Sequence, residues 1–385
     1  MSELLPISIV CTPGLEHLTR AELRGLGVAE ERPTEGLAEP GLLNAQVTHA
    51  TLYALNLHLR TAARVRINTE PFLAAAFSEL RKKAARLPWS AYLAPGAPVR
   101  IKVTTHGSAL YHKKGIAERV AGAISDALGK PSPLAEPGDE DEAGALQVFV
   151  RIVRNRCTIA IDSSGAHLHR RGYRQQVAKA PLRETLAASL VLAAGWDPAA
   201  ALADPFCGSG TIVIEAALLA AGIPPGAARR FAFMDWPSFD AAAWRSVLAT
   251  VPPPRRTGLP PLLGSDRDAG AVAAAEANAA RAGVGDLVRF TCQSISDFTA
   301  PAPSGWIITN PPYGERVRGG PDLRNLYARM GSVWRTLGPL WHTYLVTSSP
   351  RWAGHLGLPV TRVASFLNGG LPVTFYRAGG AVEPS

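Results

Sequence analysis

The sequence has few cysteines and no long hydrophobic run. Its 385 residues include four cysteines, which lie far apart and form no Cys-x-x-Cys pair. This spacing argues against a zinc site or a disulfide framework and predicts a protein of the reducing cytoplasm. No stretch of about 18 or more apolar residues occurs, and the N-terminus lacks a signal-peptide pattern, so we expect no membrane partner. The nine histidines show no metal-ligand spacing, so we expect no metal.

Acidic residues are outnumbered by basic ones. There are 31 Asp and Glu against 40 Lys and Arg, a formal net charge of +9. The basic residues concentrate in 60–119 and in 151–183, on either side of an acidic loop at 136–142. One such cluster would be explained as a solvated surface, whereas two favour binding of a polyanion. A hydrophobic content of 47% excludes a disordered chain and suits two or three packed domains. The oligomeric state stays open.

The first part of the chain has the pattern of two α+β units. Residues 1–60 form the first unit, with strands expected at 7–10 and 45–47, a helix from Leu15 to the glycines at 25 and 27, and a helix at 48–59. Residues 61–165 form the second unit. It has a strand at 98–104, a basic amphipathic helix at 111–128, and a hairpin of 146–151 and 157–161 that turns near Asn155. The polar, basic stretch 166–182 is predicted to be a linker.

Helices and strands then alternate through residues 183–385. The helices are expected at 182–194, 211–221, 268–282 and 322–337, and the strands at 200–204, 261–266, 287–292, 306–310 and 341–347. Such alternation predicts an α/β fold with a parallel, doubly wound sheet. Residues 223–258 interrupt it as an insertion rich in Pro, Arg and aromatic residues. The run Leu367-Asn368-Gly369-Gly370 predicts a closing hairpin.

Two strand ends offer groups that suit a nucleoside-like ligand without phosphates. The first is the glycine turn, Asp204-Pro205-Phe206-Cys207-Gly208-Ser209-Gly210-Thr211, where glycines permit a close approach of the backbone. It has neither the spacing of a dinucleotide fingerprint nor the Lys of a P-loop, and an ordinary tight turn is the alternative. Asp204 is placed to bind an ammonium group. Asp266, at the end of the next strand, is placed to accept from two ribose hydroxyls, or else to cap the following helix, a role that Asp268 could equally fill.

The most informative motif is Asn310-Pro311-Pro312-Tyr313, directly after an apolar strand. Its prolines fix an extended backbone, so that the Asn310 side chain and the Pro311 carbonyl can both accept hydrogen bonds from one planar amino group. Tyr313 offers a face on which a base can stack. The motif therefore predicts methylation of an exocyclic nitrogen, with an ordinary Asn-Pro turn as the alternative.

The sequence supports a role in the site less strongly for the neighbouring residues. Glu315 and Arg316 are kept as orienting residues, although a surface ion pair explains them equally well. Cys207 resembles the nucleophile of a C5 methylase only superficially. A small, half-buried loop residue is the more natural explanation, because an amine held by acceptors needs no covalent catalysis.

These motifs together resemble the THUMP-domain RNA methyltransferases, and most closely the bacterial RlmL-type 23S rRNA guanine-N2 methyltransferases. Thr104–Leu128, in which Ser108–Lys114 opens a helix, is similar to the THUMP core. The other similar segments are Leu168–Arg174 and Ala180–Ala187 (junction motifs), Pro225–Trp244 (RlmL-type insertion) and Leu367–Gly369 (closing hairpin). The resemblance implies a ferredoxin-like unit (1–60), a THUMP domain (61–165), a linker (166–182) and a Rossmann-like class I methyltransferase domain (183–385). Some relatives carry a second methyltransferase behind this one, and we expect none in a chain that ends at Ser385.

The resemblance also implies site residues. The catalytic residues are Asn310, Pro311 and Tyr313. The residues that bind S-adenosyl-L-methionine are Pro181, Leu182, Arg183, Glu184, Asp204, Pro205, Phe206, Gly208, Gly210, Thr211, Asp266, Arg267, Ser294 and Asn310. In one position the chain departs from the family, because Ser294 stands where an acid usually holds the adenine amino group. Asp297 is an alternative for that role.

The expected function is S-adenosylmethionine-dependent methylation of guanine N2 in 23S rRNA or its precursor. The same chemistry on tRNA is the second candidate, and a DNA adenine-N6 methylase or a methylase of protein glutamine is the third. A non-enzymatic RNA-binding or assembly protein with a vestigial methyltransferase fold is the alternative from another class. The intact Asp204, Gly208, Gly210, Asp266 and Asn310 speak against it. Lys113, Lys114, Arg170, Arg171 and Arg174 are the expected phosphate contacts.

Overall fold

The computed structural model describes residues 4–31, 39–135, 144–175, 182–313 and 320–379. The chain divides into two compact units. The first unit comprises residues 1–10, 23–168 and 229–251, and the second comprises 11–22, 169–228 and 252–385. Each unit is therefore assembled from separated stretches of chain, and residues 229–251 fold within the first unit. The borders predicted at 60, 165 and 182 stay predictions.

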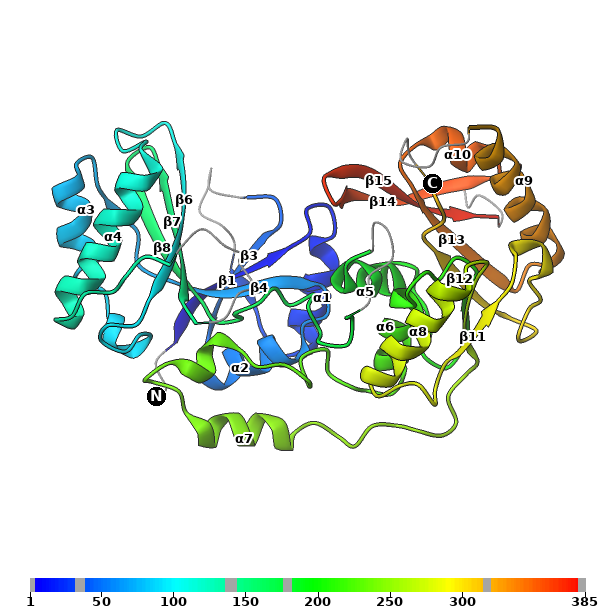
Figure 1. The fold of residues 1–385 in the computed structure, drawn as a ribbon, viewed down its shortest axis with the longest axis horizontal. Coiled ribbons are helices and arrows are strands. Elements are labelled where there is room, and N and C mark those ends of the chain that lie inside the picture. Colours follow the sequence, from blue (N-terminus) through cyan, green and yellow to red (C-terminus); the bar gives the residue numbers. More distant parts are fainter. Residues whose placement is uncertain (1–3, 32–38, 136–143, 176–181, 314–319, 380–385) are drawn as a thin grey trace. The chain divides into compact units, whose positions relative to one another are not determined.

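The first unit is an α+β structure (Figure 1). Its strands are β1 (Leu5–Cys11), β2 (Glu30–Glu31), β3 (Leu42–Val47), β4 (Ala62–Asn68), β5 (Phe72–Leu73), β6 (Val99–His106), β7 (Leu146–Val153) and β8 (Arg156–Asp162). Its helices are α2 (His49–His58), α3 (Phe77–Ala84), α4 (Lys113–Leu128) and α7 (Ala241–Ala249), with 3-10 turns η1 (Trp89–Ala91) and η2 (Ala232–Asp235). Helix α1 (Glu16–Gly25) begins in the second unit and ends in the first.

These strands form one sheet in the order β2-β3-β1-β4-β8-β7-β6, to which β5 adds by pairing with β8. Because β4 lies between β1 and β8, it joins the two segments that the sequence analysis separates at residue 60. The predicted hairpin near Asn155 is confirmed as β7 and β8. Its turn residues Arg154 and Asn155 have φ of 49° and 63°, a conformation that Asn tolerates better than most residues.

The sequence pattern did not predict β4, because this strand buries charge. Arg64 is 1% exposed and its Nη1 atom lies 2.9 Å from Oδ2 of the equally buried Asp162. Arg66 places its guanidinium 3.5 Å from the centroid of the Phe149 ring. Burial raises the pKa of Asp162, while the two arginines act to lower it. Basic residues at these positions interrupt the apolar alternation by which a strand is recognised.

The aromatic residues of the insertion belong to the core of the first unit. The Tyr53 ring of α2 stacks on Phe233 with 4.3 Å between centroids, and Trp244 meets Tyr53 edge-on at 6.3 Å. Phe231 stacks on Phe233 in turn. Tyr53 also accepts a hydrogen bond from the backbone of Asp240. The insertion is therefore anchored by a buried aromatic cluster within this unit.

The second unit is an α/β structure. Its strands are β9 (Ala201–Asp204), β10 (Leu262–Asp266), β11 (Arg289–Cys292), β12 (Gly305–Thr309), β13 (Trp341–Thr347), β14 (Val360–Asn368) and β15 (Leu371–Ala378). Its helices are α5 (Glu184–Ala193), α6 (Thr211–Ala220), α8 (Ala269–Arg281), α9 (Gly320–Thr336) and α10 (Pro350–Gly354), with the 3-10 turn η3 (Ile295–Asp297).

The sheet of the second unit has the order β11-β10-β9-β12-β13-β15-β14. The strands from β11 to β13 are parallel, and β15 and β14 add as an antiparallel hairpin. Figure 1 shows α6 and α8 on one side of this sheet and α9 and α10 on the other. The predicted doubly wound α/β sheet and its closing hairpin are confirmed. Strand order changes direction between β9 and β12, which is where ligands bind in such folds.

Candidate active site

Three predicted site residues meet at one edge of this sheet. β9 pairs in parallel with both β10 and β12, so the carboxyl ends of these strands lie side by side. Asp204 ends β9, Asp266 ends β10, and Asn310 directly follows β12. The sheet thus brings together the two acids and the amide that the sequence analysis proposed on separate grounds.

The glycine turn (204–211) carries the chain from β9 into α6. Gly210, with a φ of 84°, is the residue before the first turn of α6. Gly208 has a φ of 52°, and a Cβ atom built on it would meet no atom within 4 Å. Cys207 donates its backbone N–H to the Ser265 carbonyl at 2.9 Å, which ties the turn to β10. The turn is therefore fixed by its own backbone and is open at Gly208.

Asn278 of α8 also holds the glycine turn, a role that the sequence analysis missed. Its side chain is fully buried and its Nδ2 atom donates to the carbonyl of Ser209 at 3.0 Å. Arg281, one turn further along α8, bonds to the other end of the Asn278 amide and to the Tyr173 carbonyl. The carbonyl of a turn residue has no sequence signature, so no motif could have indicated this contact.

Asp204 is buried beside the strand that leads into the substrate motif. It is 2% exposed, and its Oδ1 atom accepts from the hydroxyl of Thr309 at 2.6 Å and from the Phe206 N–H at 3.1 Å. Burial raises the pKa of this carboxyl to about 7, with a further rise from the charge of Asp266, whereas the two hydrogen bonds lower it. Thr309 immediately precedes Asn310, so this bond links the acid of the glycine turn to the substrate motif.

Asp266 is not the cap of the helix that follows it. Asp268 fills that role, accepting from the backbone N–H groups of Gly270 and Ala271. Asp266 instead uses Oδ2 to accept from the Gly208 N–H and Oδ1 to accept from the Asp268 N–H, both at 3.0 Å. Its half-buried carboxylate therefore spans the loop after β10 and the glycine turn, and its remaining lone pairs can accept from ligand hydroxyls.

The Asn-Pro-Pro-Tyr turn (310–313) presents an acceptor that the protein leaves unpaired. The Oδ1 atom of Asn310 is buried and has no hydrogen-bond partner among the described residues. Pro311 is buried, and the hydroxyl of Tyr327 on α9 donates to the carbonyl of Pro312 at 3.3 Å. A buried amide oxygen without a donor is costly, so its place is consistent with a donor brought by a ligand.

Tyr313 is anchored by the closing hairpin. Nδ2 of Asn368 donates to its hydroxyl at 3.0 Å, and the ring packs against the apolar core of the unit. Burial raises the pKa of Tyr313 and the bond from Asn368 lowers it. The sequence analysis assigned a role to the ring alone, so the hydroxyl contact and Asn368 are additions from the structure.

The other predicted cofactor residues are less directly placed. Leu182 and Glu184 are buried at the start of α5, Arg183 is exposed, and Pro181 lies outside the described residues, as do Glu315 and Arg316. Arg267 and Ser294 are exposed beside Asp266 and at the end of β11, respectively. Ser294 accepts from the Ser296 N–H and so caps η3, and Asp297 is exposed. The roles of these residues in binding stay predictions.

Two of the five arginine and lysine residues predicted to contact phosphates are held in ion pairs with buried carboxylates, which corrects that assignment. Arg171 is 3% exposed, with Nε 3.5 Å from Oε1 of Glu215. Arg174 lies 2.6 Å from Glu184, whose pKa is raised to about 7 by burial in spite of that arginine. Neither guanidinium can leave its partner for RNA without stranding a buried carboxylate. Arg170 is exposed, as are Lys113 and Lys114 at the start of α4.

Helix α4 begins with a basic and aromatic surface. His112 caps it through Nδ1, which accepts from the Gly115 N–H at 3.1 Å, and Lys113 and Lys114 follow. Tyr111 beside them is 77% exposed. Ammonium groups next to an exposed ring form a surface that suits a nucleic-acid backbone and an unstacked base.

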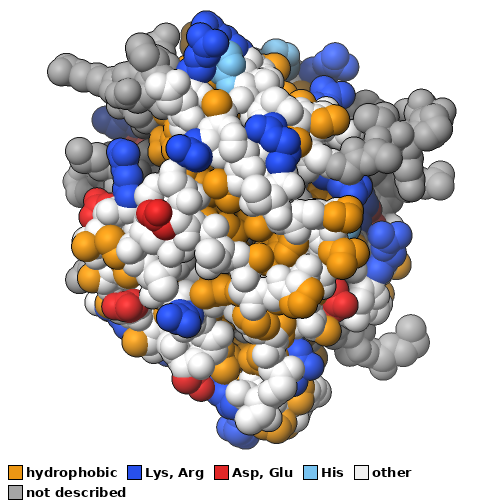
Figure 2. All heavy atoms as spheres, turned by 90° about the vertical axis from the view of Figure 1, so that its right-hand side faces the viewer, with side chains coloured by type: hydrophobic (Ala, Val, Ile, Leu, Met, Phe, Trp, Pro, Cys, Tyr) orange, Lys and Arg blue, Asp and Glu red, His pale blue; other side chains and the backbone are white. Residues whose placement is uncertain are grey.

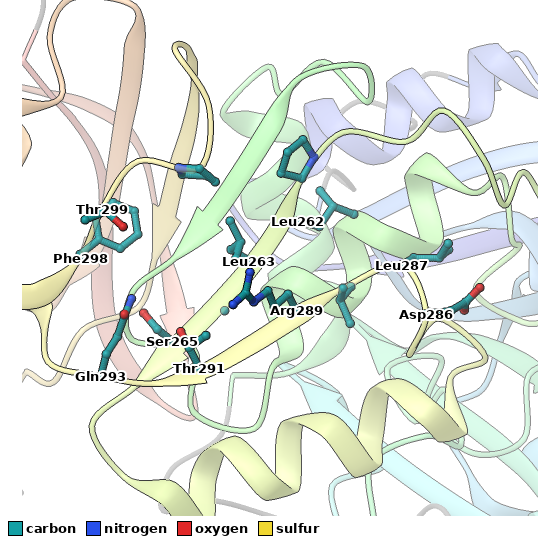
Figure 3. Close-up of a pocket in the computed structure, with 14 residues that line it drawn as sticks. Leu262, Leu263, Ser265, Asp286, Leu287, Arg289, Thr291, Gln293, Phe298 and Thr299 are labelled. Atoms are coloured by element: carbon teal, nitrogen blue, oxygen red, sulfur yellow. The ribbon is translucent and has the colours of Figure 1, made fainter.

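A groove of about 570 Å³ borders the site along β10 and β11 (Figure 3). It runs from Ser265 and Gln293, next to Asp266, toward Asp286 and Leu287. Between β11 and β12 the only helical element is the 3-10 turn η3, and every residue of that connection is described. Figure 2 shows apolar side chains across the middle of one molecular face, with Lys and Arg mainly toward its upper part and margins. The groove adjoins the Asp266 end of the site without including Asp204 or Asn310.

Cys207 is poorly suited to act as a nucleophile. Burial raises the pKa of the Cys207 thiol, which therefore stays protonated and is a poor nucleophile.

Within the ranges that the structure describes, no group of three or more His, Cys, Asp or Glu side chains is arranged to hold a metal ion. In the same ranges no helix is both long and apolar enough to span a bilayer.

The hydrogen-bond acceptors at these strand ends fit S-adenosylmethionine. That molecule carries an ammonium and two ribose hydroxyls, which need acceptors, and the carboxylates of Asp204 and Asp266 are acceptors at adjacent strand ends. The open space beside Gly208 leaves room for a ligand against the backbone of the glycine turn.

Three family models match the chain in succession. Residues 7–66 match the RlmL ferredoxin-like domain, residues 74–162 match the THUMP domain, and residues 171–374 match the RMKL-like methyltransferase domain. The predicted order of ferredoxin-like unit, THUMP domain and methyltransferase domain is confirmed.

Curated relatives and a solved structure match nearly the whole chain. The chain is 34% identical to "Ribosomal RNA large subunit methyltransferase K/L" of Syntrophotalea carbinolica, with 95% of the chain and 52% of that protein aligned. It is 32% identical to "Putative RNA methyltransferase YpsC" of Bacillus subtilis, with 96% and 95% covered. The chain spans about half the length of the K/L relative. Among solved structures, SMU.472, "a putative methyltransferase complexed with SAH", matches with a TM-score of 0.85, 29% identity and full coverage of both chains.

Proposed function

The chain belongs to the family of proteins with an RMKL-like methyltransferase domain, and on that premise we propose that it methylates guanine N2 in 23S rRNA with S-adenosylmethionine as donor. The observation that carries the proposal is the buried Oδ1 of Asn310, which has no hydrogen-bond partner among the residues that the structure describes and which follows β12, next to the strand that ends in Asp204. An exocyclic amino group is the kind of donor that would satisfy this oxygen.

The residues of the chain act by binding and positioning. S-adenosylmethionine supplies an electrophilic methyl group on a sulfonium. Asp204 and Asp266 hold the two polar ends of this donor molecule. Asn310 and the Pro311 carbonyl accept the two hydrogens of the guanine amine, which favours a pyramidal nitrogen with its lone pair available. Tyr313 supports the flat face of the base. The methylated amine then loses a proton to water, so no separate base is needed.

RNA is favoured over DNA by the first unit. It contains a THUMP domain, and α4 of that domain exposes Lys113 and Lys114 beside Tyr111. Ribosomal RNA is favoured over tRNA by the similarity to a K/L relative and by the insertion, whose aromatic residues are fixed in the first unit. The target guanine is flipped out of its stack to reach Asn310, as enzymes that modify a base require.

Nucleoside mapping in cells tests the substrate. We expect 23S rRNA from cells that lack this protein to miss one N2-methylguanine, and expression of the parent chain to restore it. The Asn310→Ala variant, produced at equal level, should not restore it. Loss of an N2-methylguanine from tRNA instead would show that tRNA is the substrate, and unchanged guanine methylation in both RNAs would refute the proposal.

A further inference from the structure

The hairpin of β14 and β15 reaches the substrate motif from the far edge of the sheet. Asn368 at the end of β14 donates its Nδ2 hydrogen to the Tyr313 hydroxyl at 3.0 Å. The loop between the strands consists of Gly369 and Gly370, with φ of 57° and 84°, as a two-residue type I′ turn requires. This tight turn sets Asn368 directly opposite Leu371.

Strand register decides which hairpin side chains face Tyr313. Residues opposite each other in an antiparallel pair project from the same face, so Leu371 lies on the Asn368 face. Phe366 and Val373, the next pair on that face, are buried in the core against which Tyr313 packs. Leu367 pairs with Pro372 and projects from the opposite face.

The exposed leucines of the tip are therefore not equivalent. Leu371 is 44% exposed and lies on the face that carries the anchor of Tyr313, whereas Leu367 is 54% exposed on the other face. An apolar side chain beside the edge of a fixed aromatic ring extends the surface on which a planar ligand can rest. Leu367 provides a matched control, being the same residue type at similar exposure four positions away.

We propose that this hairpin is the outer wall of the base-binding site, with Asn368 positioning the Tyr313 ring and Leu371 contacting the flipped purine. The proposal rests on the function proposed above, since it takes the purine to enter beside Asn310. Tying the hydroxyl fixes the plane of the phenol ring, so that a base does not have to order it on binding. Leu371 then covers apolar area of the base or of the sugar attached to it.

The first test compares the two leucines. Leu371→Ser and Leu367→Ser are assayed for methyl transfer to deproteinised 23S rRNA from cells lacking the protein, and for affinity toward S-adenosylhomocysteine. We expect Leu371→Ser to raise KM for RNA about tenfold with cofactor affinity unchanged. Leu367→Ser should behave as the parent. Equal changes in KM for the two substitutions, or no change for Leu371→Ser, would show that Leu371 does not contact the flipped purine.

The second test is a double-mutant cycle on the Asn368–Tyr313 bond. If Asn368 acts through the hydroxyl, Asn368→Leu should raise KM for RNA in the parent but add little in a Tyr313→Phe background. Asn368→Gln, which keeps a donor amide, should recover part of the loss. Additive effects of Asn368→Leu and Tyr313→Phe would mean that the asparagine does not position the ring.

A third measurement separates this proposal from the function on which it rests. Methylation of a base other than guanine would refute the proposed target. The comparison of Leu371→Ser with Leu367→Ser would still test whether the hairpin forms the outer wall of the base-binding site. If no transfer occurs, ultraviolet cross-linking of the parent to the same 23S rRNA decides instead. We expect nucleotide adducts on Tyr313 and on peptide 363–377 that Leu371→Ser weakens and Leu367→Ser does not. Adducts confined to the first unit would overturn the proposal.

Discussion

The two halves of the candidate active site differ in how their acceptors are used. In the cofactor half, both oxygens of Asp266 and one oxygen of Asp204 already accept hydrogen bonds from the protein, and Asn278 holds the glycine turn from behind. In the substrate half, the buried oxygen of Asn310 has no partner in the part of the chain that the structure describes. We infer from this difference that the proposed cofactor half is preformed and that the proposed substrate half is completed by its ligand.

The difference implies that substitutions can separate turnover from cofactor binding. A substitution in the cofactor half should reduce affinity for the cofactor, because the contacts of this half exist before chemistry begins. A substitution in the substrate half should reduce turnover, because the contacts of this half form with the reacting amine.

The largest effect is expected at Asn310. Asn310→Ala should reduce turnover by about a hundredfold or more, because the substitution removes an acceptor for the reacting amine. Affinity for S-adenosylhomocysteine, measured by calorimetric titration, should remain near that of the parent. Asn310→Asp keeps an acceptor and should be less harmful. Full turnover in Asn310→Ala would mean that this residue does not hold the amine.

The converse result is expected at Asp266. Asp266→Ala should weaken cofactor binding by about 1–3 kcal/mol, since it removes acceptors for ribose hydroxyls and the bonds to Gly208 and Asp268. Because Asp266 is half-buried at the very end of β10, its replacement should leave the fold intact, which thermal unfolding can check. At saturating S-adenosylmethionine, turnover of the variant should approach that of the parent. A folded variant with parental affinity would contradict the assigned role.

The pH dependence of cofactor binding tests Asp204. Its pKa is raised to about 7, whereas an unfolded Asp titrates near about 3.9, so the folded, cofactor-free protein holds an extra proton between these values. This protonation stabilises the fold at acidic pH, and the contribution is lost as pH rises through about 7. A cationic ammonium favours the ionised carboxyl. Binding at pH 6 should therefore release a proton, and affinity should fall up to about tenfold per pH unit below 7.

Calorimetry in buffers of different protonation enthalpy measures that proton. Asp204→Asn should abolish the release and flatten the pH profile. Glu184 is the necessary comparison, since burial also raises its pKa to about 7, but it is paired with Arg174. We expect the proton release to survive in Glu184→Gln. A release that disappears in Glu184→Gln and persists in Asp204→Asn would show that Glu184, and not Asp204, gives up the proton.

The smallest effect is expected for two lysines of the first unit, because Asn310, Asp204 and Asp266 all belong to the second unit. Replacing both Lys113 and Lys114 by Ala should lower the salt slope of log RNA affinity by about 0.7 to 0.9 for each phosphate that the variant no longer neutralises, without changing which base is methylated. Lys130, exposed just beyond the other end of α4, serves as a control, and Lys130→Ala should leave the slope unchanged. A parental slope in the double variant would indicate that these charges serve only solubility.

The sequence was most informative where a motif coincides with a strand end. The alternation from α5 to β13 predicted the elements that place Asp204, Asp266 and Asn310, and the Asn-Gly-Gly run predicted the hairpin. It was least informative where polar groups are buried by distant partners. Strand β4 was hidden by its arginines, and Arg171 and Arg174 were taken for surface residues because their acidic partners lie on other elements. The contacts of Asn278 and Asn368 join segments that only the folded chain brings together.

Identification of the methylated nucleoside tests the central claim most directly. The purified parent chain is incubated with deproteinised 23S rRNA from cells that lack it and with S-adenosylmethionine labelled in its methyl group, and the RNA is digested to nucleosides for mass spectrometry. We predict that the label appears in N2-methylguanosine, and that Asn310→Ala forms at most about a hundredth as much. Label in N6-methyladenosine or in a carbon-methylated base, or equal label with Asn310→Ala, would contradict the account.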